Sequence, residues 1–118
     1  MLELLERLVA FKYSCKLNHW KTSEYAKHLL FDRMQEDIDD LVDEVAEEYF
    51  MASAKQNELN KEIFNTEYID RDLIKLSMQI KEHIEMIVAK NTYNQGILSL
   101  LGNISESFDG KIALLRLN

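Results

Sequence analysis

The sequence has no proline, only three glycines and a single cysteine. Proline and glycine interrupt helices more strongly than other residues, so their scarcity favours helix in a chain rich in Leu, Glu, Lys, Ile and Ala. The single cysteine, Cys15, cannot form an internal disulfide and is expected to be a small buried residue, which fits a reducing cytoplasm. These absences predict an all-α cytoplasmic protein.

Long hydrophobic runs and clustered positive charge are also absent. The apolar runs are too short for a membrane-spanning helix. We expect no signal peptide, because no basic and then apolar segment precedes a small-residue cleavage site. The net charge is −7, and the sequence starts Met1-Leu2-Glu3, without a basic arm. Since nucleic-acid surfaces need clustered Lys and Arg, we expect no direct DNA binding.

What remains has the pattern of a single helical domain over residues 1–118. Hydrophobic residues make up 47% and charged residues 30% of the chain, as in globular proteins. Apolar residues at helical spacing predict helices over residues 2–20, 25–54, 69–90 and 94–116. Thr22 or Ser23 is the expected N-cap of the second helix. Residues 55–68 are polar and are predicted to form a connection with one short helical turn around 57–63.

Four such helices predict a four-helix bundle. Short links favour antiparallel neighbours, whereas the connection over residues 55–68 is long enough to cross the length of the bundle, as in ferritin-like bundles. The sequence pattern leaves both topologies open.

The helix predicted over residues 25–54 has two ordered faces. Its first face is apolar and is expected to lie in the core: Leu30, Met34, Ile38, Leu41, Val45, Tyr49 and Ala52. Its second face carries two pairs at i,i+4, namely His28 with Asp32 and Asp43 with Glu47, within about 100° of one another and away from the core face. The same face includes Tyr25, Leu29, Ala46 and Phe50. Because a solvated face does not need such residues, we predict a subunit interface.

The spacing of the two pairs requires two copies of the helix. Asp32 and Asp43 lie about 16 Å apart along the helix, so both pairs of one chain cannot reach one ion. An antiparallel second copy that crosses between residues 37 and 38 would place His28 opposite Glu47 of the partner subunit. The same register would place Asp32 opposite Asp43 of the partner subunit. We therefore predict a homodimer or larger homo-oligomer with two equivalent shared sites, about 22 Å apart.

His19 supplies a further candidate ligand. It ends the first predicted helix, and a tight turn before His28 would bring both imidazoles to one end of the bundle. The predicted ligand set is His19, His28 and Asp32 from one subunit, with Asp43 and Glu47 from its partner. Two imidazoles and three carboxylates suit iron, manganese or zinc.

A simpler interpretation is that the acidic second helix presents a solvated charged face. Any spacing rule finds matches among so many carboxylates, and the proposed crossing would also bring Glu36 close to Asp39 of the partner subunit, where they repel. Trp20 is expected to pack at the bundle end, with a redox-active aromatic as the alternative. His83 lies at the edge of the third helix's apolar face and is expected to be a surface or structural residue.

Residues 18–50, NHWKTSEYAKHLLFDRMQEDIDDLVDEVAEEYF, resemble the ferroxidase region of Dps proteins, the mini-ferritins. That family shows His-Trp at the end of one helix, His-x-x-x-Asp early in the next, and then Asp-x-x-x-Glu. The counterparts here are His19-Trp20, His28 with Asp32, and Asp43 with Glu47. The resemblance implies a ferritin-like four-helix bundle that binds iron at these five residues, with ferroxidase activity at sites shared across a two-fold axis.

The segment HWKTSEYAKH is also similar to short ferritin-like proteins of tailed phages, which implies a location in the host cytoplasm. Two functions remain open. The first is a Dps-like protein that oxidises or sequesters Fe(II) in a homo-oligomer. The second is a metal-free ferritin-like interaction protein that dimerises through the second helix or binds a host or viral partner.

Overall fold

The computed structural model describes residues 1–60 and 62–117, with the backbone alone for Asn60. It contains four α-helices: α1 (Leu2–Lys21), α2 (Tyr25–Val45), α3 (Leu73–Lys90) and α4 (Gln95–Arg116). No residue in these two ranges lies in a β-strand, so the all-α prediction is confirmed. None of the described helices has an apolar stretch of membrane-spanning length.

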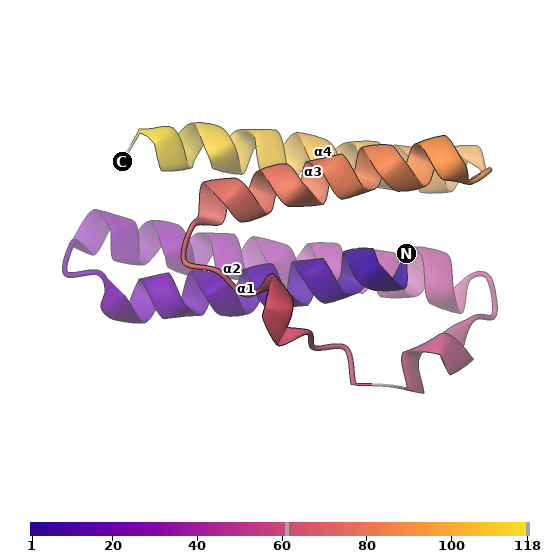
Figure 1. The fold of residues 1–118 in the computed structure, drawn as a ribbon, viewed down its shortest axis with the longest axis horizontal. Helices are drawn as coiled ribbons and strands as arrows, with labels where there is room; N and C mark the ends of the chain where they lie inside the picture. Colours follow the sequence, from indigo (N-terminus) through magenta and orange to yellow (C-terminus); the bar gives the residue numbers. More distant parts are fainter. Residues whose placement is uncertain (61, 118) are drawn as a thin grey trace.

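The helices form two pairs, α1 with α2 and α3 with α4, which stack as two layers (Figure 1). The helices α2 and α3 run in the same direction, so the chain between them returns along the length of the bundle (Figure 1). This crossover strap, residues 52–72, contains two short 3₁₀ turns, η2 (Gln56–Asn60) and η3 (Thr66–Tyr68). Of the two topologies that the sequence left open, the structure has the crossover.

The strap is fastened to α1. The ring of Phe64 meets that of Tyr13 edge-on at 5.8 Å between centroids. The Ser14 hydroxyl accepts a hydrogen bond from the backbone N–H of Asp70 at 3.2 Å, and the Asn18 amide donates to the carbonyl of Arg71 at 3.2 Å. Polar groups of the last turns of α1 therefore fix the path along which the strap reaches α3.

One predicted helix start and one predicted N-cap need correction. The third helix begins at Leu73 and not at residue 69, because the Asp72 side chain accepts a hydrogen bond from the N–H of Lys75 at 3.0 Å and caps the helix there. The second helix begins at Tyr25 as predicted, but neither Thr22 nor Ser23 is its N-cap. That position is held by Glu24, whose side chain makes no capping hydrogen bond. The predicted turn around 57–63 is present as η2, and Lys61 lies outside the described residues.

The second predicted helix does not continue as an α-helix to residue 54. From Ala46 to Met51 it is a π-helix, η1. There the backbone carbonyl of Glu47 accepts a hydrogen bond from the N–H of Ala52, five residues later, at 3.1 Å. Hydrogen bonds between residues five apart bring such residues close to the same face of the helix. Phe50 therefore follows Val45 into the core and is 0% exposed, whereas the α-helical register had placed it on the outward face.

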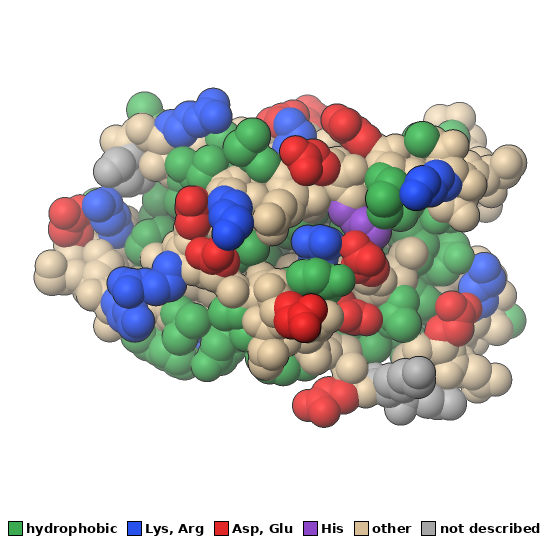
Figure 2. Space-filling view, in the orientation of Figure 1, with side chains coloured by type: hydrophobic (Ala, Val, Ile, Leu, Met, Phe, Trp, Pro, Cys, Tyr) green, Lys and Arg blue, Asp and Glu red, His purple; other side chains and the backbone are tan. Residues whose placement is uncertain are grey.

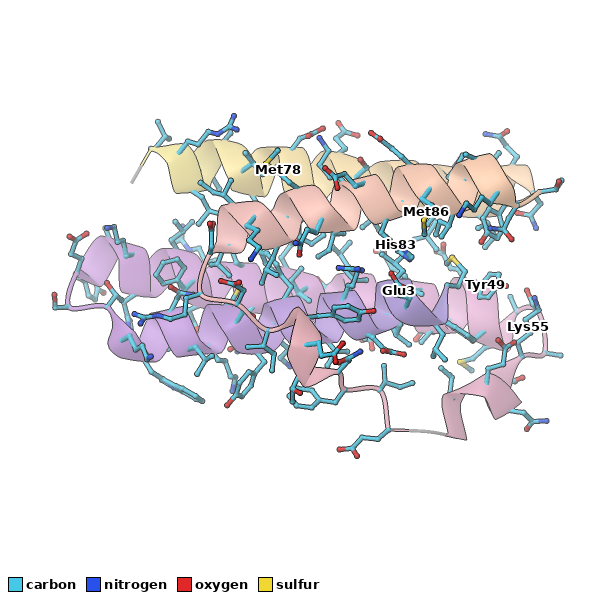
Figure 3. All side chains as sticks on the ribbon, in the orientation of Figure 1. Glu3, Tyr49, Lys55, Met78, His83 and Met86 are labelled. Carbon is cyan, nitrogen blue, oxygen red and sulfur yellow. The ribbon has the colours of Figure 1, made fainter. Side chains whose placement is uncertain are left out.

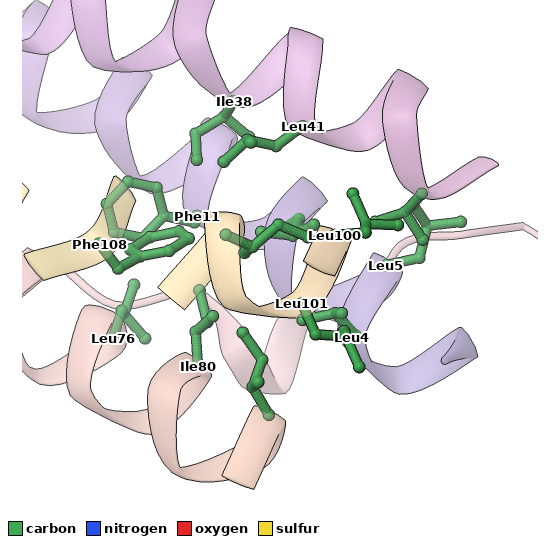
Figure 4. Packing of buried hydrophobic residues seen from close by; sticks show 14 of the residues in the cluster. Leu4, Leu5, Phe11, Ile38, Leu41, Leu76, Ile80, Leu100, Leu101 and Phe108 are labelled. Carbon is green, nitrogen blue, oxygen red and sulfur yellow. The ribbon is translucent and has the colours of Figure 1, made fainter. Parts of the chain in front are cut away.

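The core runs through all four helices (Figure 4). At its centre the rings of Phe11 and Phe108, both 0% exposed, meet edge to face at 5.0 Å between centroids. The apolar stripe predicted for the second helix is buried only in part. Leu30 on α2 and Tyr49 on η1 are half-buried and Ala52 is exposed, whereas Phe31, which was not in the stripe, is buried.

A buried lysine ties α4 to α2. Lys111 is only 5% exposed, and its ammonium donates to the carboxylate of Asp37 on α2 and to the hydroxyl of Ser107 at 2.6 Å. A buried charge is tolerated when it is paired and hydrogen-bonded in this way. The pair thus sets where α4 rests on α2.

Cys15 is 0% exposed, and burial raises the pKa of its thiol to about 12. Because the thiolate is the reactive form, we expect folded protein to resist Ellman's reagent at mildly alkaline pH and to react with one equivalent once denatured in guanidinium. Absorbance of the released thiolate follows both reactions. Complete labelling of the folded protein at the rate of a free thiol would contradict the buried position.

Candidate metal centre

His19 and His28 meet at the turn between α1 and α2. Their rings stack with centroids 3.7 Å apart and planes 25° from parallel. The predicted approach of the two imidazoles is therefore confirmed. It follows from the short link, because α1 ends at Lys21 and α2 starts at Tyr25, so the last turn of one helix faces the first turn of the other.

Reciprocal hydrogen bonds hold the two rings. The Nδ1 atom of His19 lies 2.9 Å from the carbonyl oxygen of His28, and the Nδ1 atom of His28 lies 3.2 Å from the carbonyl oxygen of His19. A carbonyl oxygen only accepts, so each Nδ1 carries the proton that it donates. In the neutral ring Nε2 then has a free lone pair. Histidines that bind metals are commonly oriented by such a bond from the other nitrogen.

The three predicted carboxylate ligands are not gathered around this pair. Asp32 lies one turn beyond His28 and is half-buried, while Asp43 and Glu47 are exposed farther along the chain. Among the described residues, no three His, Cys, Asp or Glu side chains lie close enough together to hold a metal ion. A single chain therefore brings together two of the five predicted ligands.

In the described part of the chain, no cation is paired with these carboxylates. Within residues 1–60 and 62–117, Asp32, Asp43 and Glu47 take part in none of the ion pairs. Asp32 and Asp43 lie in the regular part of α2, where the straight-helix register applies. Glu47 lies in the π-helical segment, which turns its side chain away from the angle that an α-helix would give.

Two large aromatic side chains flank the imidazole pair. Trp20 is 62% exposed and Tyr25 is 76% exposed, although the sequence had indicated that Trp20 packs at the bundle end. The prediction that Trp20 packs at the bundle end is therefore wrong. The side chain projects from the last turn of α1 and stays largely exposed. A shallow cavity of about 300 Å³ next to His28 is lined in part by Tyr25.

The sequence pattern does not indicate that His83 contacts Glu3. Of the two expectations for His83, surface or structural, burial excludes the surface one, since the residue is 6% exposed and its Nδ1 lies 3.0 Å from the carboxylate of Glu3. The two residues lie on α1 and α3, so no local spacing in the sequence signals the contact.

A family model matches residues 19–115, described as a family of unknown function, DUF5856. All five predicted ligands lie within the matched range, whereas most of α1 precedes it. No curated protein and no solved structure matches the chain. Since the match extends over residues 19–115 of the 118, this protein belongs to the family of unknown function DUF5856.

Proposed function

We propose that this protein is a Dps-like member of the ferritin-like superfamily that binds iron at sites shared between two-fold-related subunits and oxidises or sequesters Fe(II). The observation that carries the proposal is the imidazole pair. His19 and His28 each donate Nδ1–H to a backbone carbonyl, so Nε2 of each neutral ring keeps its lone pair, and one ion can bind both once the stacked rings turn apart.

The crossover strap supports the ferritin-like assignment. Up-down bundles with short loops need no long connection, and one long crossover is the arrangement of ferritin-like bundles. In this chain the single crossover joins two helices that run in the same direction, α2 and α3 (Figure 1).

The incomplete ligand set in one chain supports sharing. A second α2, antiparallel and crossing between residues 37 and 38, would bring Asp43 of the partner subunit to the half-site of His19, His28 and Asp32. Glu47 of the partner subunit follows in η1, where the π-helical turn sets its direction. Unpaired carboxylates from two chains repel unless a cation lies between them. Iron would therefore serve both as cargo and as the ion that makes this interface favourable.

The chemistry suits Fe(II) as substrate. Carboxylates stabilise the ferric product more than the ferrous substrate, and an open coordination position admits the oxidant, O₂ or peroxide. The same donor set accepts manganese or zinc. The protein's part is to hold two imidazoles and to surround the ion with negative charge.

A second candidate function is a metal-free interaction protein. It is favoured by the exposed aromatic side chains of Trp20 and Tyr25, since aromatic residues are enriched at protein interfaces. In that case the end of the α1–α2 hairpin would bind a protein partner, and the imidazole pair would only stabilise the turn.

Aerobic Fe(II) titration distinguishes the two. We expect the wild type to bind iron and to accelerate the rise of ferric absorbance, and the double variant His19→Gln/His28→Gln to lose both effects because no imidazole lone pair remains. The matched control is Asp40→Asn, an exposed carboxylate of α2 outside the ligand set. Native mass spectrometry gives the bound metal and the oligomeric state. Iron bound equally by the double variant would reject the imidazole site.

A further inference from the structure

A second polar hollow lies between α1 and α3, away from the imidazole pair at the α1–α2 turn. The cavity measures about 430 Å³ and is lined by side chains of α1, η3 and α3. In Figure 2 one imidazole is visible in this hollow, and its position is that of His83 in Figure 3. Carboxylates of Glu3, Glu67 and Glu82 also line it and outnumber the single guanidinium of Arg7, so the lining is negative and favours a cationic occupant.

The imidazole of His83 has one satisfied nitrogen and one that is not. Its Nδ1 lies 3.0 Å from the Glu3 carboxylate, whose oxygen can only accept, so in the neutral ring the proton is on Nδ1 and Nε2 bears the lone pair. Nε2 is buried, and no group in the described part of the chain donates a hydrogen bond to it. Burial also lowers the pKa of His83, against the opposing effect of Glu3, so the ring is held neutral. A buried acceptor without a donor costs free energy unless a ligand engages it.

The Glu3 carboxylate is itself held in place. The Arg7 guanidinium donates to it at 3.1 Å, and the same guanidinium lies 4.1 Å from the ring centroid of Tyr68. A carboxylate that accepts from one imidazole nitrogen and leaves the lone pair of the other nitrogen unused is the arrangement that orients metal-binding histidines. Glu3 therefore orients the His83 ring as carboxylates orient histidines that bind metals, which a histidine that only packs in the core does not need.

Met86 provides a second donor. It follows His83 by three residues on α3, which puts both side chains on one helical face, and both line the hollow (Figure 3). The described residues hold no group of three His, Cys, Asp or Glu suited to a metal, so a hard ion that needs several oxygen ligands is not provided for. A thioether is a soft donor of the kind that selects Cu(I), and imidazole also binds copper.

We propose that His83 and Met86 form a binding site for a soft monovalent metal ion, Cu(I), with Glu3 as the positioning residue of the imidazole. Nε2 is enclosed, so a side chain that lines the hollow must move to admit the ion. Met86 is 40% exposed, and its unbranched side chain readily changes conformation. The site shares no residue with the proposed iron site, so either proposal can fail without the other.

The test uses Ag(I), a redox-inert probe for Cu(I), in a His19→Gln/His28→Gln background that removes the other imidazole pair. With ¹³C-methyl-labelled methionine, we expect Ag(I) to shift the Met86 methyl resonance at low equivalents. Met78 is the internal control, because it lies on the same helix and is 46% exposed but does not line the hollow. Equal shifts of Met78 and Met86 would mean only non-specific thioether binding and would overturn the proposal.

Variants then assign the ligands. Met86→Leu is expected to lower the Ag(I) affinity at least about tenfold, as is Glu3→Gln through loss of orientation of the ring, whereas Met78→Leu leaves it unchanged. Because Met86 is partly exposed, its substitution leaves the fold intact and tests the site even if a His83 variant does not fold. Unchanged affinity in Met86→Leu would reject the assignment.

Discussion

Mixing the Asp32→Ala and Asp43→Ala variants is expected to restore about a quarter of the wild-type iron-binding capacity, although each variant alone binds none. In each homodimer both shared sites lack a ligand. In a mixed dimer one site carries both defects, while the other has intact Asp32 from one chain and intact Asp43 from the other. Random exchange makes about half of the dimers mixed, and each mixed dimer has one of its two sites intact.

The measurement is Fe(II) titration of each variant and of the mixture, after native mass spectrometry has shown that subunits exchange. Mixing either variant with Asp40→Asn provides the control, because Asp40 is exposed and outside the ligand set. A site contained within one chain gives no recovery, so the absence of recovery rejects sharing. Full binding by either single variant rejects that residue as a ligand.

Phe50→Ala is expected to lower the free energy of unfolding by about 3–5 kcal/mol, the cost of truncating a fully buried aromatic side chain. Phe50 is 0% exposed because the π-helical turn directs it inward. The neighbouring Met51 is 54% exposed, so Met51→Ala should change stability by less than about 0.5 kcal/mol. Urea unfolding followed by circular dichroism measures both. Equal effects of the two substitutions would show that residues 46–51 keep the ordinary α-helical register.

The helices could be predicted because their apolar residues repeat at helical spacing, and the ends of α1 and α4 agree closely with that pattern. The start of α3 could not, because Ile69 continues the apolar spacing while the backbone there is extended and Asp72 caps the helix. The π-helix could not either. Phe50 is accommodated in the core only because the hydrogen bonding changes there. A pattern that assumes the same rotation at every residue cannot show where such a change occurs.

The candidate site divides in the same way. The approach of His19 to His28 was predictable because a link of few residues forces adjacent helix ends together. The Nδ1 hydrogen bonds were not, because they depend on the direction of two backbone carbonyls at the turn. The contact of His83 with Glu3 joins α3 to α1 and depends wholly on how the strap brings the two helices together.

The crossover strap makes the chain two helical hairpins in series. Each hairpin closes over a short link, whereas docking α3 on α1 closes a loop that contains α2 and the strap. Short-range contacts form first because they lose less chain entropy, so docking is the late step of folding. Loop entropy rises by only about 0.6 kcal/mol for each doubling of length. The exposed residues 52–58 should therefore tolerate inserted residues, whereas the 22–24 link should not, since its length keeps the two imidazoles in contact.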